Sequence, residues 1–413
     1  LASMLVFMSL LKYHNLHSNY LDLGSFLHQM SQIADNHEIR ILVTHIQPFL
    51  LFLAQAYNFF PGETAPYVIL AFQALFLTLP AVGLYYYYGS LPTLAFCLYF
   101  PIWYNALFDF HVDHLAIPFL FAFFFLEKQN KVWWAVVAAV GLALVKEIFA
   151  IQVLFVGLYL VFIRRHHLPG VTLIFFSLLY YWGVTQYLQP YIMAQFAFLS
   201  GGHDIFSSDN SVYGWLGRDL GEVIMFVLTH PHIVLQNIIN TDGKILFIFY
   251  AFGALGFIPI LRPGILLVSI PIWASTLLSS SPNHYGYVNH YTAGLVAPMI
   301  IAFAEGLPRV RQLWERVHLN PAWLGPLLVA GMVMVHCLLS PSPIGRKFYV
   351  EKSWFYHHTI YSPSKRNDMI KSAIRSHVPV DPDIILSAQN SLNLNHLAQR
   401  KTVSVFPDGA VEA

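Results

Sequence analysis

The sequence predicts an all-α polytopic membrane protein followed by a small α/β unit outside the membrane. Composition is the first observation behind this prediction, because 57% of the 413 residues are hydrophobic and only 10% are charged, against about a quarter charged in a typical soluble domain. The mean hydropathy is +0.56. The second observation is that long apolar runs recur along most of the chain. Together they exclude an ordinary soluble enzyme.

Apolar runs that can cross a bilayer as short or tilted helices occupy much of residues 1–340. They are 1–12, 66–87, 90–107, 115–126, 132–145, 148–163, 170–188, 245–261, 264–279, 292–304 and 322–340. We therefore expect about eleven transmembrane helices in this region. The run 1–12 is too short to cross about 30 Å at about 1.5 Å per residue, so we expect it to be the second half of a first span whose N-terminal sequence is missing.

The charges of the loops predict the orientation of this bundle. If residue 13 lies outside the cell, the inner loops 85–90, 127–131, 164–169, 262–263 and 305–321 contain eight Lys or Arg and three acidic residues. The outer loops before residue 341 contain five basic and twelve acidic residues. Because Lys and Arg gather on the cytoplasmic side, we expect a multi-pass protein of the bacterial inner (plasma) membrane with its active side extracytoplasmic. The net charge of +1 argues against a nucleic-acid partner.

Two long outer loops, 13–65 and 190–243, and the tail 341–413 complete the predicted layout. The apolar run Ile46–Phe60 is expected to be re-entrant, because counting it as a span would place the basic loops outside. A helix is expected from Gly221 to about Ile239. In the tail we expect short strands at 384–386 and 402–406 and helices at 365–376 and 391–399. The tail is expected to be incomplete and, with the outer loops, to offer surfaces for protein partners.

Ionisable residues that border the spans are the first functional candidates, because a charge at membrane depth is costly unless it is paired or faces a cavity. Asp22 follows the first span. It can act as the N-cap of the next helix, or as a general base at the membrane boundary, where burial raises the pKa of a carboxyl group. His45 precedes the re-entrant run on the same outer side and is a candidate for substrate binding.

The segment Asp109–His114 contains two carboxylates and two imidazoles within six residues. In an extended conformation Asp109, His111 and Asp113 point the same way, a spacing that can hold a divalent metal ion through oxygen and nitrogen. His111 and His114 can instead donate hydrogen bonds to a phosphate or a sugar. The third alternative is a solvated hairpin whose polar residues cap the neighbouring helices.

Lys146 and Glu147 lie between two apolar runs and either neutralise each other or bind substrate, with Lys146 as a point charge for a lipid-linked phosphate. The polar outer loop 279–291 ends in His290 and Tyr291, which suit sugar hydroxyl groups, although a turn-rich loop has a similar composition. The sequence contains no Gly-rich phosphate loop, no Gly-x-Ser-x-Gly and no His-Glu-x-x-His. The inner loops are too short for a catalytic domain, so any donor is expected to be membrane-borne or extracytoplasmic.

Short motifs in a fixed order carry a resemblance to a known family. They are Tyr20–Phe26 (YLDLGSF), Thr44–Pro48 (THIQP), Phe108–His111 (FDFH), Val145–Glu147 (VKE), Asn289–Tyr291 (NHY), Ser387–Leu392 (SAQNSL), His396–Arg400 (HLAQR) and Phe406–Asp408 (FPD). With these motifs the chain resembles the predicted membrane proteins catalogued as domain of unknown function 2079, from about residue 13 to 408. That family is similar in layout to the GT-C glycosyltransferases, which use polyprenyl-phosphate sugars and an acidic catalytic base in the first outer loop.

The resemblance implies that Asp22 is the base of an inverting glycosyltransferase working on the outer face. Its donor would be a lipid-linked sugar in the bilayer, and Lys146, His111 or His114 would stabilise the departing phosphate, with or without a divalent metal ion. The alternative is a non-catalytic scaffold, or a subunit of a larger complex, that reuses the GT-C layout. A transporter is less favoured, because the predicted spans carry almost no ionisable residues at mid-depth.

Overall fold

The computed structural model describes residues 1–36, 45–60, 62–195, 212–350, 355–379, 381, 383–392, 394–400 and 403–405. Up to residue 107 the elements are α1 (Ala2–His14), η1 (Tyr20–Gly24), α2 (Ser25–Asn36), α3 (Phe49–Tyr57), η3 (Gly62–Thr64), α4 (Ala65–Thr78), α5 (Pro80–Tyr88), α6 (Ser90–Leu98) and α7 (Phe100–Leu107). The predicted run 90–107 is divided between α6 and α7. Tyr99 is extended there, and Pro101 lies in the first turn of α7, where its missing N–H costs no helical hydrogen bond.

The next elements include two helices whose backbones approach each other closely. They are η4 (Val112–Leu115), α8 (Ala116–Lys128), α9 (Val132–Ala143), α10 (Glu147–Leu158), η5 (Tyr159–Ile163), α11 (His167–Gly183), η6 (Val184–Leu188) and α12 (Gln189–Gln195). A Cβ added to Gly157 of α10 would lie 2.8 Å from the carbonyl oxygen of Gly170 in α11. Glycine at these two positions therefore lets the two backbones approach each other.

The following part of the bundle contains a sharp bend that the sequence did not predict. Its elements are α13 (Leu220–Thr229), α14 (Pro231–Ile239), α15 (Asp242–Gly253), η7 (Ile258–Leu261), α16 (Pro263–Leu266), η8 (Leu267–Ser269), α17 (Ile270–Leu278), α18 (Pro282–Tyr285), η9 (His290–Thr292), α19 (Ala293–Arg316), η10 (Pro321–Trp323) and α20 (Leu324–Leu339). The single helix expected over 221–239 is wrong, because α13 and α14 meet at 91°. Pro231 begins α14 and cannot continue the hydrogen bonding of α13.

The core of the bundle lies around α7, α8 and α19. In the apolar window of the α19 segment, 72% of the residues are buried, against 22% for the α11 segment and 17% for α20. Large side chains of the core, such as Tyr104, Phe121 and Phe303, are at most 1% exposed. Helices α11 and α20 therefore form the periphery, and their exposed apolar side chains suit contact with lipid.

Among the residues that the structure describes, four helical segments are long and apolar enough to cross a membrane by themselves: Gly62–Tyr88, His167–Ile192, His290–Arg316 and Pro321–Leu339. The bent pair of α13 and α14 raises the count to five if it is one span. Further apolar helices, Val132–Ala143, Glu147–Ile163 and Pro263–Leu278, are shorter. The predicted apolar runs coincide with helices, but breaks such as the one at Tyr99 keep several below spanning length. The structure thus supports a helical membrane protein with four or five candidate spans, and the full count of eleven stays a prediction.

The described part of the tail contains η11 (Arg346–Phe348), η12 (His358–Tyr361), α21 (Lys365–His377), β1 (Leu386–Ala388), η13 (Asn390–Leu392), η14 (Asn395–Leu397) and β2 (Val403–Val405). The strands pair in parallel, with Leu386 opposite Val403. The helix expected over 391–399 is wrong, because this stretch forms the two short turns η13 and η14. Asn390 and Asn395 begin these turns, as expected for a residue type that favours turns over helix interiors.

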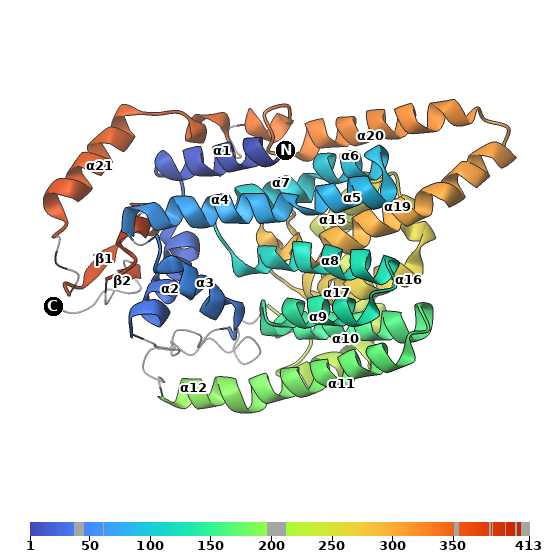
Figure 1. Ribbon diagram of the computed structural model, residues 1–413, viewed down its shortest axis with the longest axis horizontal. Helices are drawn as coiled ribbons and strands as arrows, with labels where there is room; N and C mark the ends of the chain where they lie inside the picture. The colour runs from blue at the N-terminus through green and yellow to red at the C-terminus, as the bar shows by residue number, and fades with distance from the viewer. Residues whose placement is uncertain are drawn as a thin grey trace.

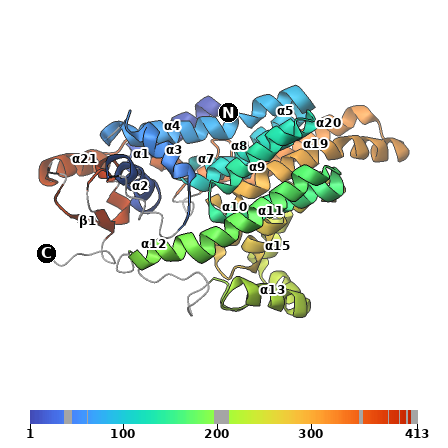
Figure 2. The same cartoon turned by 60° about the horizontal axis from the view of Figure 1, so that its bottom comes forward.

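The bundle is elongated (Figure 1). At one end, on the left of Figure 1, lie α2, α3, β1, β2 and α21, and the connection from α19 to α20 lies at the other. Four predicted inner loops, 85–90, 127–131, 164–169 and 305–321, meet at that second end. Glu305 accepts hydrogen bonds from Tyr88 at 2.9 Å and Lys128 at 3.2 Å, and Arg164 pairs with Glu127. Turning the molecule shows α13 standing away from the layer formed by α9, α10 and α11 (Figure 2).

Candidate functional site

A buried ion pair joins the end of α1 to the loop after α7. The Nζ of Lys12 lies 3.1 Å from Oδ1 of Asp109, and neither side chain is more than 2% exposed. Lys12 also donates a hydrogen bond to the carbonyl oxygen of Leu107 at 3.0 Å, and its ammonium lies 3.7 Å from the ring centroid of Phe355. The backbone N–H of Asn19 donates to Oδ2 of Asp109 at 2.8 Å. Both buried charges are thus compensated, which is the condition for burying an ion pair without a large cost.

Asp22 lies in the π-helical turn η1, directly before α2. Its side chain is half-buried and has no hydrogen bond or ion pair within the described residues. The helical segment begins at Tyr20 with Asn19 as its N-cap residue, so Asp22 does not take the N-cap position that was one alternative. Burial raises the pKa of the Asp22 carboxyl group to about 7, with a further contribution from Asp109 and an opposing one from Lys12. This carboxyl group can therefore exchange its proton near neutral pH.

The tail packs against the turn that carries Asp22. The side-chain oxygen of Asn390 accepts a hydrogen bond from the backbone N–H of Leu21 at 2.7 Å. A Cβ added to Gly24 would lie 2.5 Å from Oδ1 of Asn395, so the close approach of η14 to η1 requires glycine at this position. Residues almost 370 positions later in the chain thus hold η1 in place.

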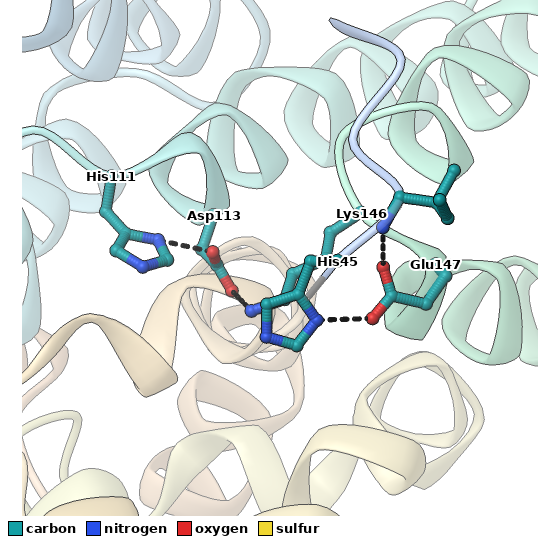
Figure 3. A network of polar contacts seen from close by, with 6 residues as sticks. His45, His111, Asp113, Lys146 and Glu147 are labelled. Carbon is teal, nitrogen blue, oxygen red and sulfur yellow. Dashed lines mark hydrogen bonds and ion pairs between the residues drawn. The ribbon is translucent and has the colours of Figure 1, made fainter. Parts of the chain in front are cut away.

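Glu147, the first residue of α10, is held by the segment that precedes α3 (Figure 3). Its Oε1 lies 2.6 Å from Nδ1 of His45, and its Oε2 accepts the backbone N–H of Ile46 at 3.0 Å. A carboxylate at a helix N-terminus also interacts favourably with the helix dipole. Lys146 turns away from Glu147, and its Nζ lies 3.5 Å from Oδ1 of Asp113. The two neighbours therefore do not neutralise each other, although mutual neutralisation was one alternative for this pair.

Asp113 connects Lys146 to His111 (Figure 3). Its Oδ1 faces the ammonium group of Lys146, and its Oδ2 forms an ion-pair contact with Nδ1 of His111. Burial raises the pKa of Asp113, but the charge of Lys146 and the hydrogen bond with His111 outweigh burial and hold it well below its usual range. Burial lowers the pKa of His111. At neutral pH this group therefore contains an ionised carboxylate beside a largely neutral imidazole.

His290, Tyr291 and His114 complete the group. The rings of His111 and His290 are stacked, with centroids 3.7 Å apart and planes 13° apart, and the Tyr291 ring lies 4.2 Å from that of His290. His114 is fully buried, and burial lowers its pKa to about 3. We call the residues of this group the polar cluster: His45, His111, Asp113, His114, Lys146, Glu147, His290 and Tyr291.

Asp22 lies beside the polar cluster. The carboxylates of Asp22 and Asp113 are both within electrostatic range of the Tyr291 hydroxyl group. Phe26, on the next turn after Asp22, packs its ring 4.9 Å from that of His111. The structure therefore brings the predicted catalytic and substrate-binding residues to one end of the bundle, although they come from separate stretches of the chain.

Asp109 lies in the Lys12 pair rather than with the other two residues of the predicted metal set, His111 and Asp113. The extended backbone ends at His111, where η4 begins, so the regular alternation of side chains stops there. Among the described residues, the group with potential ligand atoms within 4.8 Å of one another is His111, Asp113 and His290. The solvated hairpin that was the third alternative is wrong, because Asp109, Asp113 and His114 are at most 5% exposed.

Two structurally important residues, Gln73 and Lys12, were not predicted from the sequence. Gln73 of α4 accepts the backbone N–H of His111 at 3.1 Å and is 1% exposed, and Lys12 forms the buried pair with Asp109. Both lie within predicted apolar runs, where a polar side chain is costly without a partner. That cost is a signal readable from the sequence, but the partners lie 38 or more positions away and only the fold reveals them.

The chain matches a known family over nearly its whole length. A family model described as "Predicted membrane protein (DUF2079)" matches residues 13–412. Comparisons with curated proteins and with solved structures gave no match.

Proposed function

We proceed from the membership of this chain in the DUF2079 family of membrane proteins, and we propose that it is an inverting glycosyltransferase. It transfers a sugar from a polyprenyl-phosphate donor in the bilayer to an acceptor hydroxyl group on the extracytoplasmic face. Asp22 is the general base, and the polar cluster binds the phosphate and the sugar. The proposal depends above all on the half-buried Asp22 carboxyl group, whose pKa of about 7 suits proton transfer at neutral pH.

The surroundings of Asp22 support the role of a base. The described residues give its carboxylate no fixed hydrogen bond or ion pair, in contrast to Asp109, whose two oxygens are occupied by Lys12 and Asn19. A general base must reach the proton that it removes, so a carboxylate left without a partner beside a buried polar group is the better candidate. The nearby Tyr291 hydroxyl group suits an acceptor or donor sugar.

The polar cluster offers donors for the phosphate of the lipid. Lys146 supplies an ammonium group whose contact with Asp113 is long, at 3.5 Å. Imidazole groups of His111, His114 and His290 lie around it, and fixed donors in a water-poor site stabilise charge that develops on a leaving group. Glu147 and His45 close the far side of the cluster through their mutual hydrogen bond.

A groove on α11 suits the polyprenyl chain. It has a volume of about 620 Å³ and is lined by apolar and aromatic side chains: Val171, Thr172, Phe175, Phe176, Leu179 and Tyr180. Because α11 packs along α10, the groove ends near the start of α10, where Tyr180 lies within electrostatic range of Glu147. The groove therefore runs along the lipid-facing side of the bundle towards the polar cluster.

In the proposed reaction Asp22 accepts the proton of the acceptor hydroxyl group. The acceptor oxygen forms a bond to the anomeric carbon from the side opposite the phosphate, and the bond between that carbon and the phosphate oxygen breaks. The phosphate oxygen leaves with the electron pair, and Lys146 stabilises its charge. The anomeric configuration is inverted because a single displacement takes place.

The test of this proposal uses the full chain reconstituted in liposomes with a radiolabelled polyprenyl-phosphate sugar and a membrane extract as the source of acceptors. Asp22→Asn should lower the rate of transfer by about 10²–10⁴-fold, the usual contribution of a general base. The wild-type rate should rise as the pH increases through about 7, because the base acts only when deprotonated. Groups that face Asp22, namely Lys12, Asp109, Tyr291 and Tyr356, set this pH dependence.

The matched control is Asp368→Asn, which removes an exposed carboxylate of α21 far along the chain. It should leave the rate unchanged. Transfer that persists in Asp22→Asn would remove Asp22 from the mechanism. If the wild type transfers no sugar with any donor tried, the non-catalytic scaffold becomes the better description.

A further inference from the structure

The geometry points to a divalent transition-metal site formed by His111, Asp113 and His290. The presence of this metal site does not depend on which reaction the protein catalyses. Its role towards a phosphate rests on the proposed function. The ligand set differs from the sequence prediction, because His290 takes the place of Asp109.

Three separate positions in the chain bring the ligands together. His111 precedes η4, Asp113 lies within it, and His290 begins η9, almost 180 positions later in the chain. One nitrogen or oxygen atom from each side chain lies within 4.8 Å of the corresponding atoms of the other two. Gln73 fixes the backbone of His111 through its hydrogen bond of 3.1 Å. The site is thus built on positions that tertiary contacts hold in place.

Unpartnered buried atoms are a second, independent observation. Nδ1 of His290 is buried and has no hydrogen-bond partner in the part of the chain that the structure describes. Nδ1 of His111 and Oδ2 of Asp113 are also buried, and beyond their contact with each other the described residues offer them no partner. Asp113 and His290 are only 5% and 6% exposed. Leaving buried polar atoms unsatisfied is costly, and this cost disappears if they coordinate an ion.

The balance of charge also favours a cation. The site and its surroundings contain the carboxylates of Asp109, Asp113 and Glu147, joined by that of Asp22 once it loses its proton near pH 7, against two ammonium groups, Lys12 and Lys146. A phosphate group entering such a site meets an excess of negative charge. A divalent ion between the carboxylate of Asp113 and the phosphate would remove this repulsion, as metal ions do in phosphate sites.

Lys146 is compatible with an ion because it uses the other oxygen of Asp113. Its Nζ contacts Oδ1, whereas Oδ2 faces the imidazole of His111. Lys146 therefore acts as an outer partner that orients the carboxylate, the usual arrangement around metal ligands.

The identity of the ligands selects the class of metal. Two imidazole nitrogens and one carboxylate oxygen suit Zn²⁺, Co²⁺, Mn²⁺ or Fe²⁺, whereas Mg²⁺ and Ca²⁺ prefer oxygen ligands alone. Three protein ligands leave further coordination positions for water or for a phosphate oxygen. The site is therefore of the open kind rather than a closed structural site.

The test measures metal binding directly, without any activity assay. The full chain, purified in detergent and treated with a chelator, is titrated with Co²⁺ and Zn²⁺ by calorimetry, and Co²⁺ binding is followed by its visible absorption. The wild type should bind one ion. Loss of a residue that only orients a metal ligand weakens metal binding by about 10–100-fold. Loss of a ligand itself should cost more, so His290→Ala and Asp113→Asn should each weaken binding by at least about 100-fold.

Two further variants make the result specific. His290→Cys keeps a ligand, so it should bind Co²⁺ with a new thiolate-to-metal absorption band in the near ultraviolet that the wild type, with only Cys97 and Cys337, does not show. His284→Ala removes a nearby histidine that contacts Tyr291 but lies outside the three ligands, and it should bind as the wild type does.

The proposal is overturned if the wild type binds no ion, if His290→Ala binds as tightly as the wild type, or if the His290→Cys variant gives no thiolate band with Co²⁺. These outcomes concern the ion alone. Failure of sugar transfer with a correctly bound metal would instead count against the proposed reaction, so the two proposals fail separately.

Discussion

At the scale of single residues, two aspartates with the same side chain have different environments. Asp109 is 1% exposed and is compensated by Lys12 and by the N–H of Asn19. Asp22 is half-buried and has no such partner within the described residues. When neighbouring carboxyl groups are placed in such different environments, their roles also separate. Asp109 is therefore fixed by its partners, whereas Asp22 keeps the freedom that the proposed role of a base requires.

The raised pKa of Asp22 predicts how stability depends on pH. The folded state holds the Asp22 proton up to about pH 7, whereas the unfolded chain loses it near about pH 4. Between these values the folded state binds more protons, so stability from this group is present below about pH 4 and is lost as the pH rises towards 7. In Asp22→Asn the side chain does not titrate, so the variant does not lose this stability as the pH rises.

We therefore expect the difference in melting temperature between Asp22→Asn and the wild type to be more favourable to the variant at about pH 8 than at about pH 4. Scanning calorimetry in detergent measures it. Asp368→Asn, which changes an exposed carboxylate, should show no such trend. A difference for Asp22→Asn that stays constant across this range would mean that the carboxyl group is not perturbed by the fold.

At the scale of elements, the position of α10 controls one side of the polar cluster. Its first residue, Glu147, must face His45, and its middle must lie close to α11. Gly157 and Gly170 make this contact, where the Cβ of any larger residue at 157 would meet a backbone carbonyl at 2.8 Å. A backbone atom cannot move aside as a flexible side chain can, so the spacing of these helices depends on glycine.

Gly157→Ala should therefore lower the free energy of unfolding by about 1–3 kcal/mol, the usual cost of overpacking. Gly183→Ala is a matched control, because Gly183 is also helical and a Cβ there meets nothing within 4 Å. It should be neutral or stabilise by up to about 1 kcal/mol, since alanine restricts the unfolded chain. Thermal unfolding of both variants in the same detergent measures the difference, and equal stabilities would show that α10 and α11 can separate without cost.

At the scale of the whole molecule, the features that could be predicted from the sequence are those that depend on local patterns of apolar and charged residues. Apolar runs located the helices, and the charge bias separated the polar residues of the loops into two sets. Described members of the two sets lie at different ends of the structure, with Glu305 in contact with Tyr88 and Lys128 at one end and Asp113 in contact with Lys146 at the other. Patterns along the chain could not predict pairings between distant segments. Lys12 with Asp109, and His111 with His290, depend on how the helices pack, and no local period carries that information.

The breaks within helices were also hard to predict. The bend of 91° at Pro231 and the division of α6 from α7 depend on proline within otherwise apolar sequence. Hydropathy averages over such residues, so it gives the apolar run but not the length of the straight helix. For the same reason the number of complete crossings follows less directly from the sequence than the presence of a membrane bundle.

The separation of the two polar ends predicts that they lie on opposite sides of the membrane. The end with Arg164, Lys128 and Glu305 carries the basic loops and should be cytoplasmic, and the end with the polar cluster should be extracytoplasmic. Single cysteines can test this in a background in which Cys97 and Cys337 are replaced by alanine. Suitable exposed positions are Asn283, near the polar cluster, and Gln312, near the basic end.

In intact cells a membrane-impermeant maleimide should label Asn283→Cys and not Gln312→Cys, and permeabilisation should make both react. The reason is that the region between the two ends consists of apolar helices, such as α19 with its buried centre. It gives the reagent no aqueous path across the bilayer to the cytoplasmic end. Labelling of Gln312→Cys alone would invert the orientation and place Asp22 on the cytoplasmic side, where a donor presented on the outer face could not reach it. Labelling of both in intact cells would mean that the two ends are not separated by a membrane.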